Sequence, residues 1–307
     1  MRESLTAAVR RLAPGLFSEQ PVSVVRIEMT REVFLLFGSD ATQPACVAQI
    51  GASERLETLH AVLTILHDRV GRLVPWSIAC VPWHEGQSLH VQAGLPGVPW
   101  FRLGDRVRTI LDWAHLETRA GDALKQLHQA VAASPEWRCR VKPDAELRHQ
   151  LELLSAGDRA VPPAVVAAVR NCADRLQALG EIDWFWQHGD FCVNNLLVAP
   201  AGLGIIDFEE FGATAAPLHD EIGLGLSIHA CSSTGEDWDG ARQHVRACVA
   251  PTLRAHPQLT VHLPGLFVHH VVWRMNQCRD RPRRSAIRAR LARMLAAFAE
   301  SPNPFPA

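Results

Sequence analysis

The sequence has no tyrosine and only two lysines, Lys125 and Lys142, among its 307 residues. Arginine therefore supplies nearly all of its positive charge, and the formal net charge is −1 with a pI near 6.9. A chain so close to neutrality has no overall field that would attract nucleic acid or an anionic membrane surface. We expect neither partner, and we expect any ligand to be recognised locally.

Other missing features exclude further classes of protein. No stretch approaches the roughly 20 consecutive apolar residues of a transmembrane helix. Residues 1–17 contain charged positions and lack the uninterrupted apolar segment of a secretory signal. The eight cysteines are scattered, without the close pairs of a zinc site or redox motif. The sequence thus predicts a cytoplasmic protein whose cysteines stay as thiols.

Glycine-rich phosphate-binding motifs of the G-x-G-x-x-G or G-K-[ST] kind are also missing, which argues against a P-loop enzyme. The turn "EMTR" at residues 28–31 stands where a glycine loop would join the first two strands. Contacts to phosphate from that turn would have to come from backbone amides or side chains.

The first ninety residues mostly have the pattern of short strands. Runs rich in β-branched and aromatic residues at 22–27, 32–38 and 45–50 predict an antiparallel meander. Leucines near helical spacing then predict a helix over 54–67, with Ser53 as its N-cap. A hairpin follows, formed by residues 77–83 and 88–94, with Gly86 at its turn.

The segment "LPGVPW" at residues 95–100 marks a boundary between two lobes, because helical patterns dominate after it. Apolar residues repeat at helical spacing over 107–114 and again over 287–298. Only residues 194–208 interrupt this, with the pattern of a small hairpin. We predict an α+β chain with a small antiparallel N-lobe over 1–94 and a larger, mainly helical C-lobe over 95–307.

The candidate catalytic and metal-binding residues lie between residues 186 and 212. Moving a phosphoryl group from a nucleotide to a hydroxyl needs a carboxylate that orients the hydroxyl and accepts its proton, and oxygen ligands for magnesium. In kinases the base is followed five residues later by a metal-binding asparagine, and a metal-binding aspartate ends a hairpin. Asp190, Asn195 and Asp207 have this spacing, in "HGDFCVNN" and "IIDFEEFG".

With these motifs the sequence resembles the aminoglycoside phosphotransferase and choline kinase-like group, small-molecule kinases that share the bilobal protein-kinase fold. "LPG" at 95–97, "LKQLH" at 124–128 and "PLHDEIG" at 217–223 add to the resemblance. It implies that Asp190 is the catalytic base and that Asn195 and Asp207 bind Mg²⁺. It also implies that His188 shapes the loop behind the base and that Asp220 supports this loop.

The resemblance is interrupted on the third strand, where such kinases carry a lysine that binds the nucleotide phosphates. The corresponding position here is Gln49, a neutral amide whose contact to phosphate is weaker than a charge-assisted one. An arginine could take over this task, and the candidates are Arg26, Arg31 and Arg55. The base of ATP or GTP is expected to bind where the lobes join, at Gln92, Ala93, Gly94 and Leu95.

Two functions follow as hypotheses. The first is a kinase that transfers the γ-phosphate of ATP or GTP to a small hydroxylated metabolite or antibiotic, with an acceptor pocket built from residues 217–279. The second is a ligand-binding or regulatory protein with weak or no nucleotide binding, because Gln49 replaces the lysine. An aminoglycoside acceptor would need acidic residues for its ammonium groups, and the candidates in this region are Glu221, Glu236, Asp237 and Asp239. The oligomeric state is left open.

Overall fold

The structure is a computed structural model and describes residues 2–17, 22–28, 32–39, 41–100, 113–156, 161–232, 238–279 and 285–300. Backbone contacts divide the chain into two compact units. The sheet unit comprises Met1–Ala130 and Asn194–Glu209, and the helical unit comprises Val131–Val193 and Glu210–Ala307. The lobe boundary expected after residue 94 stays a prediction, and each unit is described by itself.

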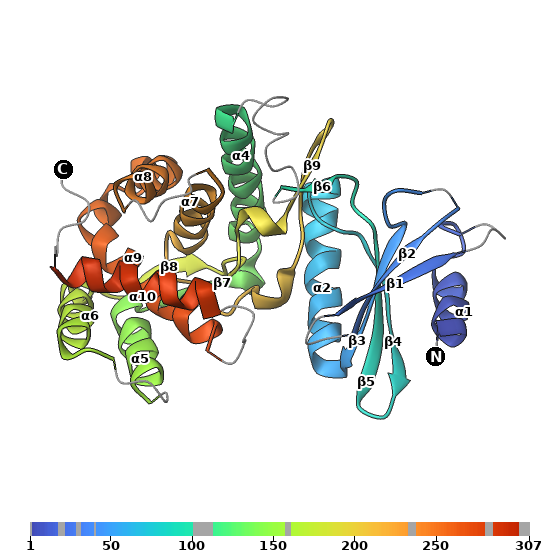
Figure 1. Cartoon of the computed structure of the whole chain (residues 1–307), viewed down its shortest axis with the longest axis horizontal. Helices are drawn as coiled ribbons and strands as arrows, with labels where there is room; N and C mark the ends of the chain where they lie inside the picture. The colour runs from blue at the N-terminus through green and yellow to red at the C-terminus, as the bar shows by residue number, and fades with distance from the viewer. Residues whose placement is uncertain are drawn as a thin grey trace. The chain divides into compact units, whose positions relative to one another are not determined.

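The sheet unit contains a five-stranded antiparallel sheet in the order β1-β2-β3-β5-β4 (Figure 1). Its strands are β1 (Ser23–Glu28), β2 (Glu32–Phe37), β3 (Cys46–Ala52), β4 (Ser77–His84) and β5 (Gln87–Ala93). This confirms the predicted meander and the later hairpin, in which Gly86 has a φ of 69° at the turn. The turn at residues 29–31 lies outside the described residues.

Helices cover both faces of this sheet, α1 (Arg2–Leu12) on one face and α2 (Ser53–Val70) on the other (Figure 1). Side chains alternate along a strand, and in β3 the buried Cys46, Ala48 and Ile50 belong to one core with Leu5 and Val9 of α1. Gln49 therefore lies on the opposite face, the one that α2 covers. Helix α1 was not predicted, although Leu5, Ala8, Val9 and Leu12 recur at helical spacing.

Helix α2 begins earlier than predicted, and the N-cap assignment to Ser53 was wrong. Ser53 is the first residue of the helix, and no side chain caps its N-terminus. The Ser53 hydroxyl instead accepts a hydrogen bond of 2.9 Å from Ser88 of β5. The contact ties the start of α2 to the sheet, so the serine is used for packing between elements rather than for capping.

A second hairpin, β9 (Leu196–Ala199) with β10 (Gly202–Ile205), completes the sheet unit, and the short β6 (Val98–Pro99) pairs with β9. The long helix α4 (Trp113–Ala132) donates a hydrogen bond of 3.0 Å from Arg119 to the carbonyl of Ala199. The predicted helix over 107–114 falls almost wholly on residues outside the described part, except for its last positions within α4.

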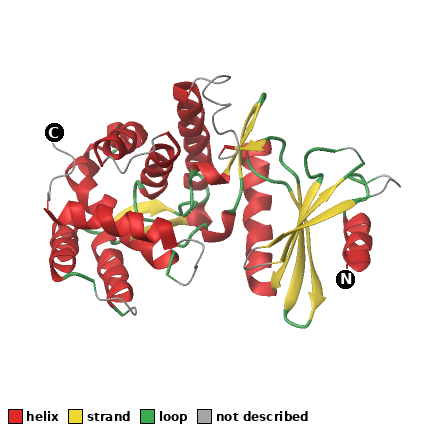
Figure 2. Cartoon of the chain, in the orientation of Figure 1, coloured by secondary structure: helices red, strands yellow, loops and turns green. Residues whose placement is uncertain are grey.

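The helical unit packs six helices of the described residues around one apolar core (Figure 2). They are α5 (Pro143–Ser155), α6 (Pro163–Leu176), α7 (His219–Ser232), α8 (Trp238–Ala255), α9 (Leu263–Gln277) and α10 (Ser285–Glu300). Helix α10 confirms the periodicity near the C-terminus, where Leu291, Leu295 and Phe298 are buried. Ile287, expected on the same face, is exposed because it lies in the first turn of α10.

The expectation of a single strand pair after residue 100 was also wrong. Strands β7 (Arg138–Val141) and β8 (Ile182–Phe185) form a small antiparallel sheet in the helical unit. Charged residues alternate along β7, so its sequence does not have the apolar run that marks a buried strand. Strand β8 leads directly into the segment that carries His188 and Asp190.

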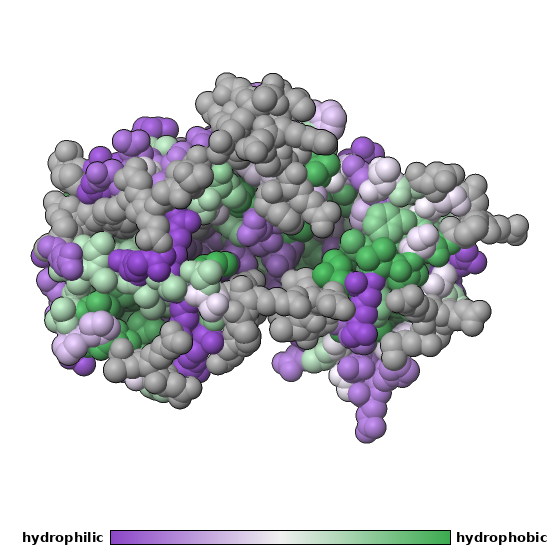
Figure 3. Space-filling model, viewed as in Figure 1, coloured by the Kyte–Doolittle hydropathy of each residue, from purple (hydrophilic) through white to green (hydrophobic). Residues whose placement is uncertain are grey.

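Apolar and polar side chains are interspersed on the surface that Figure 3 shows. The exposed large hydrophobic residues among those described include Trp76, Val25 and Val261. Among the described helices, none is both long enough and apolar enough to cross a membrane.

Candidate active site

The β9–β10 hairpin places Asn195 and Asp207 at the same end of two neighbouring strands. Leu196 pairs with Ile205. Beyond this pair, the Ile206 amide donates a hydrogen bond of 3.0 Å to the Asn195 carbonyl. Asp207 follows directly. Local strand pairing therefore brings together the two residues that the sequence predicted as magnesium ligands.

Asp207 has an unusual backbone, with a φ of 66°. Aspartate is among the few residues other than glycine that enter this left-handed region, and such conformations cluster at functional sites. Asn195 is 7% exposed and Asp207 is partly buried. Amide and carboxylate oxygens are the ligands that Mg²⁺ prefers, so the donor set at this end of the hairpin fits that ion.

An ion pair connects helix α2 to the segment that follows Asp207. Arg55, in the first turn of α2, lies 2.9 Å from the carboxylate of Glu209. Of the other arginines considered for phosphate binding, Arg26 pairs with Glu32 of the neighbouring strand at 3.2 Å, and Arg31 lies outside the described residues. Arg55 is therefore the candidate that the structure brings next to the predicted metal ligands.

Gln49 lies opposite His90 of β5 in the sheet, so the two side chains share the face that α2 covers. His90 is buried and its Nε2 is 2.7 Å from the Ser77 hydroxyl, which is also 2.7 Å from Nδ1 of His60 on α2. Burial lowers the pKa of His90 to about 4. Hydrogen bonds between three side chains thus join the helix to the sheet beside Gln49.

The segment predicted to bind the nucleotide base lies at the end of β5. The Ala93 amide donates to the Trp76 carbonyl at 2.8 Å, and the Gly94 amide donates to the Ala45 carbonyl at 2.9 Å. A Cβ atom at Gly94 would lie 1.9 Å from the Pro44 carbonyl oxygen, so only glycine fits there. Two of the amides between Gln92 and Leu95 are therefore already used within the sheet.

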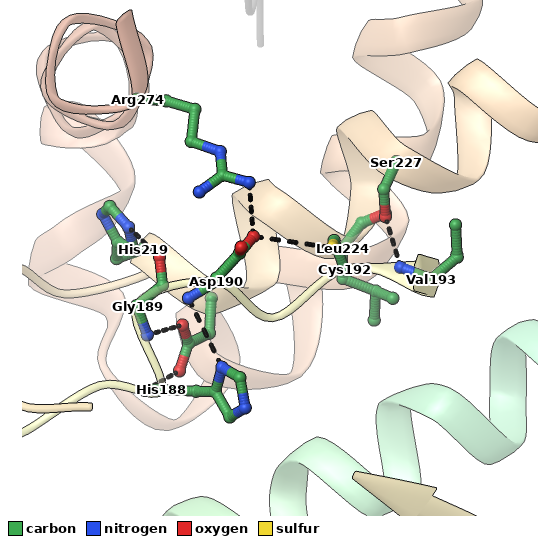
Figure 4. A network of polar contacts seen from close by, with 10 residues as sticks. His188, Gly189, Asp190, Cys192, Val193, His219, Leu224, Ser227 and Arg274 are labelled. Carbon is green, nitrogen blue, oxygen red and sulfur yellow. Dashed lines mark hydrogen bonds and ion pairs between the residues drawn. The ribbon is translucent and has the colours of Figure 1, made fainter. Parts of the chain in front are cut away.

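The loop that carries Asp190 is held by the buried carboxylate of Asp220, at the start of α7 (Figure 4). Asp220 accepts hydrogen bonds from the amides of His188 at 2.7 Å and of Gly189 at 3.0 Å. His188 is buried too, and its Nδ1 accepts a bond of 3.3 Å from the Asp190 amide. These contacts confirm the expectation that Asp220 supports the loop and agree with the loop-shaping place of His188.

Gly189 is required by the geometry of this loop. Its φ is 83°, and a Cβ atom would lie 2.4 Å from the backbone oxygen of Glu210. Its carbonyl lies 3.3 Å from Nε2 of His219. Because a carbonyl oxygen can only accept, Nε2 must carry the proton, which fixes the tautomer of His219. The amides of His188 and Gly189 and the carbonyl of Gly189 are therefore all hydrogen-bonded, which holds this part of the loop in place.

Arg274 of α9 makes the closest contact to the predicted base, and sequence reasoning missed it. Its Nη2 lies 2.5 Å from Oδ1 of Asp190, and Figure 4 shows the guanidinium above that carboxylate. Burial is the largest single influence on Arg274 and lowers its pKa, but the charge of Asp190, its hydrogen bond and the neighbouring Cys192 and Cys278 together outweigh burial and raise the pKa. The two residues are 84 positions apart in the sequence, and Arg274 is one of many arginines, so the sequence alone does not indicate this contact.

Buried histidines of α7 and α9 lie behind the loop. His219 and His270 have ring centroids 4.5 Å apart, and both are buried. Burial lowers the pKa of His270 to about 3 and lowers the pKa of His219 well below its usual value, with neighbouring positive charges adding to the effect. Both rings are therefore neutral at pH 7. No group of three or more potential metal-binding side chains of His, Cys, Asp or Glu occurs among the described residues.

Two groups of predicted site residues are thus assembled locally. Asn195 and Asp207 meet in the sheet unit, and His188, Asp190 and Asp220 meet in the helical unit. Their joint action, and the nucleotide contacts of Gln49 and of Gln92 to Leu95, stay predictions. Of the acids proposed for an aminoglycoside, Glu221 is buried and accepts a bond of 2.6 Å from Thr252, and Asp239 pairs with Arg242. Glu236 and Asp237 lie outside the described residues.

A small antiparallel sheet with a covering helix and a mainly helical second unit define the protein-kinase-like fold, as in solved structures of aminoglycoside phosphotransferase and choline kinase. Residues 35–260 match the phosphotransferase enzyme family, and the chain belongs to this family. The match confirms the predicted resemblance. The alternative, a binding protein without enzymatic activity, finds no support in these comparisons.

The chain is similar to several known small-molecule kinases. Over 158 residues it is 28% identical to streptomycin 3''-kinase of Streptomyces griseus, an alignment that covers 47% of this chain and 56% of the relative, little more than half of that protein's length. The structure resembles aminoglycoside phosphotransferase APH(4)-Ia with a TM-score of 0.64 at 12% identity, covering 99% of this chain and all of the other. It resembles choline kinase from Cryptosporidium parvum with a TM-score of 0.64 at 12% identity, covering 100% and 98%.

Proposed function

We propose that this protein transfers the γ-phosphate of ATP or GTP to a hydroxyl group of a small metabolite or antibiotic. Asp190 orients the acceptor hydroxyl and takes up its proton. A bond forms between the acceptor oxygen and the γ-phosphorus while the bond from that phosphorus to the bridging oxygen breaks, and ADP or GDP leaves. Little covalent help from the protein is required, because positioning and charge stabilisation dominate such transfers.

Asn195 and Asp207 are the proposed ligands of magnesium, which when bound would neutralise phosphate oxygens of the nucleotide. One observation supports this most strongly, the backbone bond from Ile206 to Asn195 that sets both residues at one end of the hairpin. A dedicated nucleotide site also agrees with a solved relative, a thermostable mutant of APH(4)-Ia in a ternary complex with AMP-PNP and hygromycin B.

Arg55 is the residue that we propose to supply the positive charge that Gln49 does not. It stands in the first turn of α2 and is held by Glu209, two residues after Asp207. Gln49, on the sheet face below the same helix, can donate a neutral hydrogen bond to a phosphate oxygen. The nucleotide base is expected to use carbonyl groups between Gln92 and Leu95, since the amides of Ala93 and Gly94 are engaged. The cytoplasm remains the predicted location.

The proposal does not specify the acceptor, and a screen of candidate acceptors would identify its class. Purified protein with MgATP or MgGTP would be assayed for nucleoside diphosphate release against streptomycin, hygromycin B, choline and neutral sugars. We expect one acceptor class to stimulate release, and Asp190→Asn to lower kcat by about 100-fold or more, the usual contribution of a positioned base.

Asp183→Asn is the matched control, because the Asp183 side chain is 77% exposed on β8 of the same unit. It should leave turnover unchanged. Full activity of Asp190→Asn with its acceptor would contradict the assignment of the base, and absence of any magnesium-dependent nucleotide binding would contradict the proposed reaction as a whole.

A further inference from the structure

We infer that Arg274 is a positioning residue for the reaction, one that holds the carboxylate of Asp190 in a single orientation. The inference rests on the proposed function, because it assigns Arg274 to the residue that we propose as the base. The sequence motifs do not point to it, since Arg274 lies in helix α9, far from both motifs in the sequence and beyond residues 35–260 that match the family.

The geometry of the contact is that of a strong, charge-assisted hydrogen bond. Nη2 of Arg274 lies 2.5 Å from Oδ1 of Asp190, and the two side chains are only 14% and 8% exposed. The Cys192 thiol approaches the same oxygen at 3.5 Å. Contacts between ionised partners are about twice as strong as neutral ones, and partial burial protects this pair from solvent screening.

Helix α9 holds Arg274 in a rigid position. The neighbouring Val271, Val272 and Trp273 are fully or almost fully buried in the core of the helical unit. One turn before Arg274, His270 packs against His219, whose Nε2 donates to the Gly189 carbonyl. The same helix therefore supports two consecutive residues of the loop, Gly189 through a histidine and Asp190 through an ion pair.

The ion pair limits the orientations that the Asp190 carboxylate can adopt. The charge of Asp190 and its hydrogen bond are among the contributions that raise the pKa of Arg274, so the guanidinium keeps its charge in this contact. A fixed carboxylate can accept a hydrogen bond from the acceptor hydroxyl at once, which suits a reaction that depends on positioning.

The first test separates kcat from KM, measured with whichever acceptor the screen identifies. In Arg274→Gln kcat should fall by about 10- to 100-fold while the KM for the nucleotide stays unchanged, because a misplaced base impairs the transfer step and not nucleotide binding. Arg274→Lys keeps the charge without the planar fork, so it should restore only part of kcat. An unchanged kcat in Arg274→Gln, with the fold intact, would overturn the inference.

A second test needs no activity. A double-mutant cycle of Arg274→Gln and Asp190→Asn, followed by urea unfolding, measures the coupling of the pair. We expect each single substitution to lower the folding equilibrium constant by about tenfold to 100-fold, and the double variant to lose less than the product. The control cycle uses Arg148 and Asp174, an exposed pair of 2.6 Å in the same unit, for which little coupling is expected.

The outcomes separate the inference from the proposed function. Coupling together with a lowered kcat and an unchanged KM for the nucleotide supports both. Absence of coupling overturns the inference while leaving a working kinase in place. Clear coupling in a protein that transfers phosphate to no acceptor overturns the proposed function and, with it, the positioning role, so that the pair would be structural.

Discussion

The two halves of the candidate site are built in different ways. In the sheet unit, the pairing of the four-residue strands β9 and β10 positions both predicted metal ligands. Asn195 directly precedes β9, and Asp207 follows shortly after β10. In the helical unit, Asp190 owes its place to side chains from helices α7 and α9, more than 25 positions away in sequence. Backbone pairing positions the first half, and buried side-chain contacts position the second, so the second half should respond more strongly to single substitutions.

The largest expected effect on stability is at the glycine of the helical half. Gly189→Ala forces a side chain into a φ of 83° and into the backbone oxygen of Glu210, and we expect it to lower the free energy of unfolding by at least about 2 kcal/mol. Gly86→Ala in the sheet unit is the matched control, with a φ of 69° and open space around its Cβ, and should cost about 1 kcal/mol. Equal losses on urea unfolding would contradict this contrast.

The buried histidines behind the loop predict loss of stability in acid. Their folded pKa values lie below the unfolded value of 6.5, so between these values the unfolded chain binds more protons, and stability falls as pH decreases from about 6.5. For His270, with a pKa of about 3, the loss is about 1.4 kcal/mol per pH unit.

Chemical denaturation at pH 7, 6 and 5 measures this slope. In His270→Gln the slope should be smaller by about 1.4 kcal/mol per pH unit below pH 6. An identical slope in wild type and variant would show that His270 is already protonated in the folded protein, against the expectation from its burial.

The smallest expected effect concerns the ion pair of the sheet half. Arg55 and Glu209 have side chains 38% and 16% exposed, so Arg55→Gln should change the free energy of unfolding by no more than about 1 kcal/mol. Its effect on the KM for the nucleotide should be larger, because Arg55 is proposed to face phosphate. Arg26→Gln, which removes a more exposed arginine of the same unit, should change neither quantity.

The sequence predicted the sheet half better than the helical half, for a physical reason. Strand alternation, turn residues and the five-residue spacing from Asp190 to Asn195 are local patterns, and the meander, the hairpin and the end of β10 all follow from them. Asp220 could be predicted only through the resemblance. Arg274 gave no signal, because nothing in a helix sequence tells which of its arginines meets a carboxylate 84 positions earlier.

Other misses have similar causes. Ser53 has the residue type of an N-cap but bonds Ser88 across the sheet, a tertiary contact that overrides the local preference. Strand β7 has charged residues at alternate positions and pairs only with β8, more than 40 residues later, so its sequence lacked an apolar strand pattern. Gln49 was recognised as a departure from the kinase pattern, but its neighbours His90, Ser77 and His60 became visible only in the structure.

The most direct test of the central claim, that the two halves serve different substrates, is a thermal-shift titration with magnesium and AMP-PNP. Asp207→Asn should lose the magnesium-dependent shift, whereas Asp190→Asn should keep it and lose only turnover. Loss of the shift in both variants, or its survival in Asp207→Asn, would contradict the claim that the hairpin binds the magnesium nucleotide while the loop acts on the acceptor.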